Sequence, residues 1–258
     1  MEIIVTASKR DVPLRNYPGP ATVVAGDVFA AGSAIEGTDA IAERVPSLGS
    51  THLGPGRDKL FIRSIADSSF TGQTQSTVGQ YFGEARVNYN APDPDLRLYD
   101  VASVEILPGP QGTLYGAGAM GGVLRIVPNR PDRDSAMASV SASVASTRHG
   151  ALSRELAAVA NLPLAPGGAG VRLVAYDLSE AGYIDDIGRS KKDVNRTRIR
   201  GGRVIATADI ATGWSAEAGG VYQRIDGRDG QYADRALPDL TRMTFSPSRF
   251  RTIMRWDI

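Results

Sequence analysis

The chain has 258 residues, a formal net charge of +1 and a sequence pI of about 8.0. This near-balance of charge excludes the strong basic excess typical of nucleic-acid binding, so no nucleic acid is expected as a partner. The lack of cysteine in the sequence excludes disulfide scaffolds, thiolate metal sites and cysteine nucleophiles. His52 and His149 fit no ligand spacing, and we expect neither a metal site nor a cofactor.

The hydropathy pattern offers two interpretations. No run approaches the ~18 apolar residues of a membrane helix, and the first residues lack the charged start and apolar core of a signal peptide. Taken alone, this indicates a soluble cytoplasmic protein. A transmembrane β-barrel escapes these tests because its strands alternate apolar and polar residues, which fits the mean hydropathy of -0.17. In that case Met1 is not expected to be the natural start.

The first predicted elements are short. The β-prone run IIVTA at residues 3–7 is followed by charged residues and prolines, a pattern typical of a mobile arm with one strand or of a disordered terminus. Residues 21–25 predict a strand, and Asp27 is placed to cap a short helix. Pro46 is expected to stop a second helix over residues 39–45.

Two more strands are predicted over residues 60–65 and 77–87, with a loop rich in Ser, Thr, Gly and Gln between them. Pro92 and Pro94 then break the chain before a short turn at residues 98–101. This mixture of short helices and strands predicts a small α/β unit.

Residues 104–129 form the most informative stretch. Two β-rich runs, VEIL and VLRIV, flank closely spaced Gly and Pro, which predicts a strand, a tightly turning loop and a second strand. Gly116, Gly118 and Gly121 also spell GxGxxG, the fingerprint that a soluble nucleotide-binding enzyme would carry. That fingerprint needs a helix after it, whereas the residues before Pro128 have no helical period. A structural turn is therefore the favoured interpretation.

This segment, VEILPGPQGTLYG followed by GG and a strand, resembles the signature of the plug domain of TonB-dependent outer-membrane receptors, whose usual wording is VEVLRGPQGTLYG. Residues 60–65 and 77–87 resemble two further plug strands. The resemblance implies that the plug framework includes Glu105, Gly109, Pro110, Gly112, Tyr115, Gly116, Gly121 and Gly122. It also implies a location in the outer membrane of a Gram-negative cell, in contact with its lipid.

In such receptors a periplasmic peptide, the TonB box, engages the TonB energy-coupling protein of the inner membrane. The resemblance implies that the N-terminal arm plays this part, through Ile3, Ile4, Val5, Thr6 and Ala7. An unpaired strand suits the role because it can add to the edge of a partner's sheet.

Three positions depart from the usual wording. Pro108 replaces an Arg, Ser64 replaces a Gly, and Gly83 replaces an Asp. Of the arginine pair that ties plug to barrel wall in the family, only Arg63 remains, and proline also removes an amide donor. We therefore expect a plug-barrel contact that differs from the usual one.

The sequence pattern changes after Pro131. From Met137 a strict period of two runs over eight residues, and further strands are predicted over 153–164, 171–180, 197–210, 214–225 and 250–258. Their connections alternate between tight turns and long polar loops, the pattern of an outer-membrane barrel. The predicted fold is an α/β plug domain followed by antiparallel transmembrane β-barrel strands that form an incomplete barrel.

The strand that begins at Trp214 permits a numerical test. Positions 214 to 222 on one face read Trp, Ala, Ala, Gly and Tyr, whereas Ser215 and Glu217 face the other way. Eight steps of ~3.4 Å span roughly 27 Å, or about 20 Å vertically at a tilt of ~40°. This nearly matches an apolar band of ~25 Å bounded by aromatic residues.

The charged residues of this half give no catalytic pattern. Arg196, Arg198 and Arg200 are interpreted as a solvated wall of the lumen, and Gly201 with Gly202 as a bulge that shifts the register so that later residues face lipid. The loop carboxylates miss the spacing of a calcium-binding loop. They are Asp185, Asp186, Asp226, Asp229 and Asp234.

The expected organisation is an arm at residues 1–12, a plug at 13–131 and the N-terminal portion of a barrel at 132–258. About 127 residues follow Pro131, enough for five or six strands, whereas the 22 strands of such transporters need upward of ~450 residues. We therefore expect the chain to be an N-terminal fragment.

The expected function is uptake of a scarce extracellular small molecule, such as siderophore-bound iron, without enzymatic chemistry. Residues of two plug loops are the expected ligand-facing candidates: Ser69, Phe70, Gln73, Gln75, Tyr89, Asn90 and Asp93. Two alternatives remain open from the residues, the nucleotide-binding enzyme and a plug-like binding module without transport. Titration with a dinucleotide separates the first of these from a receptor.

Overall fold

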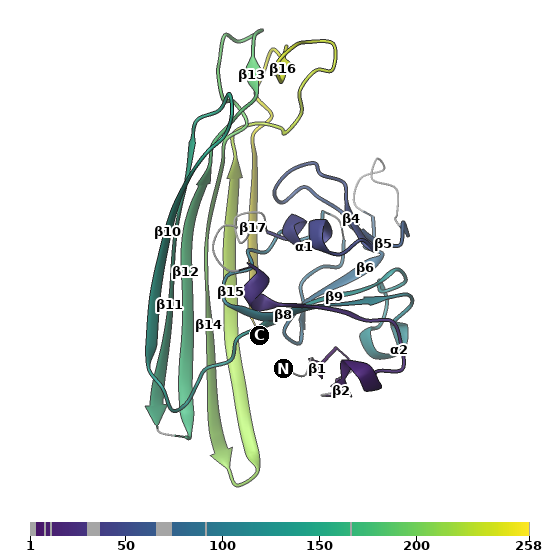
Figure 1. Cartoon of the computed structure of the whole chain (residues 1–258), viewed down its shortest axis with the longest axis vertical. Helices are drawn as coiled ribbons and strands as arrows, with labels where there is room; N and C mark the ends of the chain where they lie inside the picture. The colour runs from purple at the N-terminus through teal and green to yellow at the C-terminus, as the bar shows by residue number, and fades with distance from the viewer. Residues whose placement is uncertain are drawn as a thin grey trace. The chain divides into compact units, whose positions relative to one another are not determined.

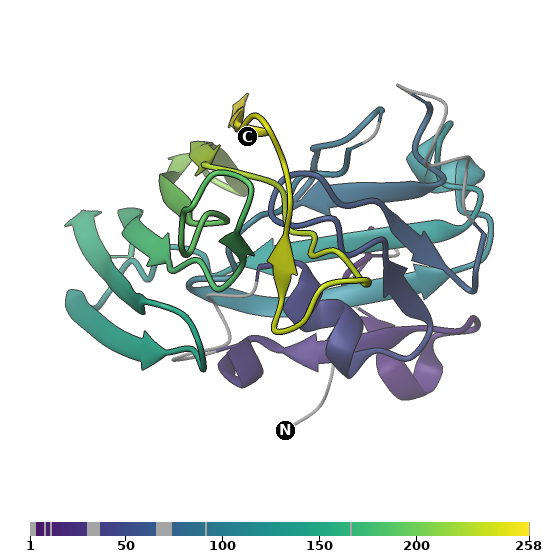
Figure 2. The same cartoon turned by 90° about the horizontal axis from the view of Figure 1, so that it is seen from above.

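A computed structural model describes residues 4–7, 9–10, 12–29, 37–65, 74–90, 92–165 and 167–257. The chain forms two compact units. The first comprises Met1–His52 and Gly56–Asn129, and the second comprises Leu53–Pro55 and Arg130–Ile258. Figures 1 and 2 show the strands and helices of each unit from two directions.

The first unit is built on a five-stranded sheet in the order β3 (Thr22–Ala25), β8 (Val101–Pro108), β9 (Gly122–Pro128), β6 (Val78–Phe82) and β7 (Ala85–Arg86). β6 and β9 are parallel, and the other neighbours are antiparallel. Ile106, Leu107, Leu124 and Ile126 are 0% exposed, as apolar runs buried on both faces require. The strand, turn and strand predicted for the signature are confirmed.

The other elements of this unit are short. They are β1 (Ile4–Val5), β2 (Val12–Pro13), β4 (Leu48–Ser50), β5 (Leu60–Ile62), 3₁₀ helices at Leu14–Asn16 and Gly26–Phe29, and helices α1 (Asp39–Arg44) and α2 (Gly112–Tyr115). The helix predicted over 39–45 is confirmed. The strand predicted over 60–65 ends at Ile62, and Asp27 lies inside its helix rather than capping it. None of the described helices is long and apolar enough to cross a membrane.

The glycines of the signature make a structural turn. Gly116 and Gly118 have positive φ angles of 71° and 77°, which glycine adopts at little cost. The amide of Gly109 donates to the carbonyl of Gly121 at 2.9 Å and closes the loop. Because β9 follows these glycines directly, no helix N-terminus exists there to bind a pyrophosphate. The dinucleotide-binding alternative therefore loses its structural basis.

Two departures from the usual plug wording lie at tight turns. Ser64 has a φ of 61°, a left-handed conformation that favours glycine and costs other residues about 1 kcal/mol. Gly83 has a φ of 59° and turns the chain between β6 and β7, so the single strand predicted over 77–87 is a hairpin. The Gly83 amide donates to the carbonyl of Ile126 at 2.8 Å.

The second unit is a six-stranded antiparallel sheet in the order β10 (Met137–Ser146), β11 (Leu152–Ala165), β12 (Ala169–Glu180), β14 (Thr197–Ala211), β15 (Trp214–Gly227) and β17 (Phe250–Asp257). Figure 1 shows the strands side by side, with the paired segments β13 (Asp185–Asp186) and β16 (Thr241–Arg242) at one end. The predicted strands are confirmed. β10 and β17 are the two edges, so the described strands do not close into a barrel (Figure 2).

The two faces of this sheet differ in polarity. On β15, Trp214 and Tyr222 share one face with Ala and Gly residues, and they are 70% and 46% exposed. Neighbouring strands add Val140, Leu162, Leu173 and Val204 to this apolar face, as the cross-strand register shows. The opposite face carries polar residues such as Asn161 and Gln223, both 0% exposed.

The bulge predicted at Gly201 and Gly202 is wrong. The register of β14 runs through both residues without a break on either neighbouring strand, and it shifts only between Asp209 and Ala211. Strict alternation therefore places Arg198 and Arg200 on the same face as Val204, the apolar one. They are not part of a lumenal wall.

Candidate functional site

The N-terminal segment, residues 4–7, is docked on the first unit. β1 pairs with β2, and the side chains of Val5 and Ala7 are 0% exposed. They share one apolar cluster with Tyr81, Leu107, Tyr115, Ala119 and Val123. The expectation of a mobile, unpaired arm is therefore wrong for these residues, because their apolar side chains are buried in this cluster. Ile3 lies outside the described residues.

Glu105 holds the backbone of this segment. Its carboxylate accepts hydrogen bonds from the Thr6 amide at 3.1 Å, from the Ala7 amide at 2.6 Å and from the Thr6 hydroxyl at 2.8 Å. The side chain is 1% exposed, so these bonds replace the water that the carboxylate loses. A framework residue of the signature thus binds the expected coupling peptide directly.

Arg125 supplies a positive charge that faces the carboxylate of Glu105. It lies opposite Glu105 in the β8–β9 register, with its Nη1 atom 3.8 Å from the carboxylate. The same guanidinium donates to the Thr6 hydroxyl and pairs with Glu84, which also pairs with Lys9. Burial raises the pKa of Glu84, but the bonds and charges of Lys9 and Arg125 outweigh this effect and lower it overall.

Tyr115 closes the contact from the signature turn. Its hydroxyl donates to the carbonyl of Ala7, and its ring meets the Tyr81 ring edge-on at 4.7 Å. Burial raises the pKa of Tyr115, which keeps the hydroxyl protonated as a donor. We call Glu105, Tyr115 and Arg125 the clasp. The sequence analysis named Glu105 and Tyr115 but missed Arg125. A charged residue inside an apolar strand was the feature that could have identified it.

The plug-loop candidates divide into two groups. Gln75 and Asn90 form an isolated β-bridge on the surface, next to Tyr89, which is 66% exposed. Asp93 is wrong as a ligand-facing residue, because it is 5% exposed and accepts bonds from the Leu60 amide and the Ser76 hydroxyl, both at 2.7 Å. Ser69, Phe70 and Gln73 lie outside the described residues.

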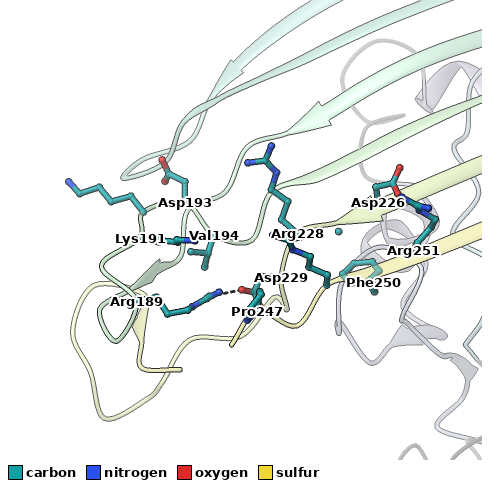
Figure 3. A pocket seen from close by; sticks show the side chains of 13 residues that line it. Arg189, Lys191, Asp193, Val194, Asp226, Arg228, Asp229, Pro247, Phe250 and Arg251 are labelled. Atoms are coloured by element: carbon teal, nitrogen blue, oxygen red, sulfur yellow. Dashed lines mark hydrogen bonds and ion pairs between the residues drawn. The ribbon is translucent and has the colours of Figure 1, made fainter. Parts of the chain in front are cut away.

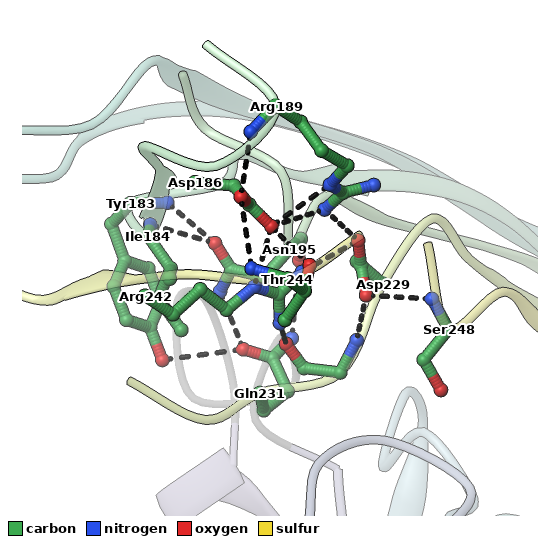
Figure 4. Close-up of polar contacts among 11 residues, drawn as sticks. Tyr183, Ile184, Asp186, Arg189, Asn195, Asp229, Gln231, Arg242, Thr244 and Ser248 are labelled. Carbon is green, nitrogen blue, oxygen red and sulfur yellow. Dashed lines mark hydrogen bonds and ion pairs between the residues drawn. The ribbon is translucent and has the colours of Figure 1, made fainter. Parts of the chain in front are cut away.

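The long loops of the second unit are joined by buried ion pairs, shown in Figure 4. Asp229 accepts bonds from Arg189 at 2.6 Å and pairs with Arg242 at 2.5 Å. Asp186 accepts bonds from the same two arginines at 2.8 and 3.3 Å and from the Thr244 hydroxyl. These five residues are the loop cluster.

The charges of the loop cluster balance. Burial raises the pKa of Asp186 and of Asp229, but their hydrogen bonds, chiefly from Thr244, Ser248 and Arg189, outweigh burial and hold both pKa values below the ordinary range. Two carboxylates therefore face two guanidiniums, and the cluster holds the loops together. Among the described residues, no group of three His, Asp or Glu has the arrangement of a metal site.

A cavity of about 810 Å³ lies beside the loop cluster (Figure 3). Its basic lining residues are Arg189, Lys191, Lys192, Arg228, Arg249 and Arg251, and its acidic ones are Asp193, Asp226 and Asp229. Six cations against three carboxylates give the cavity a positive potential, which favours anionic groups.

Comparison with known proteins agrees with this geometry. Residues 13–123 match the family model of the TonB-dependent receptor plug domain. The pesticin receptor of Yersinia pestis is 29% identical over 136 residues, which cover 50% of this chain and 19% of that protein. The chain belongs to the TonB-dependent outer-membrane receptors.

Solved receptors share the fold. The ferric yersiniabactin uptake receptor of Yersinia pestis has a TM-score of 0.64 at 19% identity, over 92% of this chain and 36% of that one. The ferripyoverdine receptor of the Pseudomonas aeruginosa outer membrane has a TM-score of 0.69 at 15% identity, over 97% and 32%. The receptor chain thus spans about a third of their length. The predicted fold class and the Gram-negative outer-membrane location are confirmed.

Proposed function

We propose that this receptor takes up a scarce nutrient from outside the cell, siderophore-bound iron or a similar small molecule, and performs no chemistry on it. In this proposal, residues 1–12 couple to TonB, residues 13–131 are the plug, and residues 132–258 belong to the barrel. Two receptors that share its fold support the ligand class, one for ferric yersiniabactin and one for ferripyoverdine.

The observation that carries the proposal is the docked N-terminal segment. A coupling peptide must be available to its partner, and a strand of a few residues can add to a partner's sheet edge. The clasp holds Thr6 and Ala7 by their backbone atoms, the same atoms that strand addition requires. TonB and the clasp therefore compete for one set of hydrogen bonds.

We propose that the ligand contacts lie at the surface of the plug. Gln75, Tyr89 and Asn90 keep their place as ligand-facing candidates because their side chains reach the surface. Arg63 is likewise exposed, and we retain it as the plug residue that contacts the barrel wall.

Deletion of Met1–Arg10 tests the coupling role in cells that depend on the receptor. We expect uptake of the nutrient to be lost while binding to the cell surface persists. A receptor variant that still transports would contradict coupling through this segment. If transport by the intact protein is never found across a broad nutrient panel, the binding module without transport is the better function.

A direct binding test isolates the clasp. The periplasmic domain of TonB, immobilised, should retain more of the Tyr115→Phe chain than of the wild-type chain, because the clasp loses its bond to the Ala7 carbonyl. Tyr99→Phe is the matched control, since Tyr99 is also buried but belongs neither to the clasp nor to the apolar cluster around Val5 and Ala7. Equal retention of all three chains would contradict competition between TonB and the clasp.

A further inference from the structure

The apolar face of the second unit changes character near the long loops. Along β15, the side chains on this face are apolar from Trp214 to Tyr222, and the next two are Arg224 and Asp226. Aromatic residues mark the edges of the apolar band in outer-membrane barrels. Arg224 lies two residues beyond Tyr222, or about 5 Å higher at the usual rise and tilt. This height is that of lipid headgroups.

Neighbouring strands place more arginines at the same level. Arg200 on β14 lies directly opposite Arg224, and Arg198 lies opposite Asp226. On the next strands, Asp177 lies opposite Arg200, and Arg251 lies opposite Asp226. Directly opposed residues of antiparallel strands point to the same face. We call Arg198, Arg200, Arg224 and Arg251 the arginine belt.

The arginine belt has more positive charge than its own carboxylates balance. Asp177 pairs with Arg198 at 2.6 Å and lies 3.8 Å from Arg200, while Asp226 pairs with Arg224 and Arg251, both at 2.7 Å. Four guanidiniums therefore share two carboxylates. Arg200 and Arg251 remain 49% and 61% exposed. Arg200 and Arg224 are like charges directly opposed in the strand register, an arrangement that is unfavourable.

The surroundings extend this positive surface. Arg154 and Arg255 lie on the same face, opposite Ser179 and Tyr222. Asp226 and Arg251 also line the basic cavity, so belt and cavity are continuous. Guanidinium groups bind phosphate through paired, charge-assisted hydrogen bonds, and they do so well where water is partly excluded.

We propose that the arginine belt binds the phosphate groups of an anionic lipid in the outer leaflet, with the acyl chains of that lipid lying on the apolar face below. Arg200 and Arg224 hold one phosphate between them and so relieve their mutual repulsion. This role is independent of nutrient uptake, and it assigns a ligand to a surface that transport does not use.

The test uses the full chain in detergent micelles and lipid A as the probe, in its phosphorylated form and with its phosphates removed. Native mass spectrometry measures the bound lipid. We expect phosphorylated lipid A to bind at least about tenfold more tightly than the dephosphorylated form, a difference equal to one good charge-assisted contact. Equal binding of the two forms overturns the proposal.

Variants locate the site. Arg200→Ala combined with Arg224→Ala should reduce the affinity for phosphorylated lipid A by about tenfold or more. Asp177→Asn should increase it, because a competing carboxylate is neutralised while the fold keeps its shape. Arg235→Ala, in an exposed loop, is the control and should change nothing. If Asp177→Asn weakens binding or the control matches the double variant, the belt is not the site.

Inorganic phosphate distinguishes a lipid from a soluble anion. Millimolar phosphate should leave most of the lipid bound, because the apolar face also contributes to lipid affinity. Complete displacement at that concentration would make the belt a site for free phosphate and overturn the assignment to lipid.

Discussion

Glu105 occupies the centre of the clasp, because one carboxylate accepts two backbone amides and a hydroxyl of the N-terminal segment. Glu105→Gln keeps the shape but removes the charge and leaves at most one acceptor oxygen. Hydrogen bonds to a charged group contribute about 2 kcal/mol each, so we expect residues 4–7 to open more readily by about that amount. Amide hydrogen exchange of this segment should accelerate by roughly 30-fold.

The matched control is Glu43→Gln. Glu43 is exposed on α1, and the same chemical change there should leave exchange at residues 4–7 unaltered. If the Glu105 variant exchanges at the wild-type rate, the clasp does not hold the segment.

Acid should weaken the loop cluster by protonating Asp186 and Asp229. Asp186 and Asp229 have folded pKa values below the ordinary 3.8, so their contribution to stability is complete above that value. It is lost as the pH falls through the lowered folded values. We expect proteolysis of the long loops, by an acid-active protease, to rise only below about pH 3.8. Loosening already at pH 5 to 6 would contradict this.

At the scale of single elements, alternation on β10 gives a paired prediction. Val140 lies on the apolar face and is 73% exposed, whereas its neighbour Ser141 points to the other face. In a receptor whose barrel is closed, Val140→Arg should destabilise the protein in lipid vesicles by about 2–4 kcal/mol, because the charge enters hydrocarbon. Urea unfolding followed by tryptophan fluorescence measures this loss.

Ser141→Arg supplies the comparison one residue away. On the polar face the same substitution should stay within about 0.5 kcal/mol of wild type. Equal losses at both positions would mean that the faces are not divided between lipid and water.

The strands of the second unit could be predicted from the sequence, whereas their register could not. The strands of the second unit follow from a period of two, since each residue's face is fixed by its neighbours along the chain. The predicted bulge at Gly201 and Gly202 was wrong because glycine permits a bulge without requiring one. Cross-strand pairing decided the register, and with it the face of Arg198 and Arg200.

At the scale of the whole molecule, the sheet of the second unit has two edges, β10 and β17. Unpaired backbone groups at an edge are costly in hydrocarbon, where no water can satisfy them. We expect the 258-residue chain, expressed as it stands, not to insert as a stable monomer. Electrophoresis of unboiled and boiled samples should show no heat-modifiable barrel band, and such a band at monomer size would contradict the expectation.

The sequence by itself determined the plug signature and the positions of most strands along the chain, because these depend on turns and periods within short stretches. It named Glu105 and Tyr115 as framework residues without showing what they hold. Only the tertiary structure decided that the N-terminal segment is docked, that Asp93 is buried and that arginines from separate strands form one belt. Each of these depends on contacts between residues distant in the chain, and local pattern does not encode them.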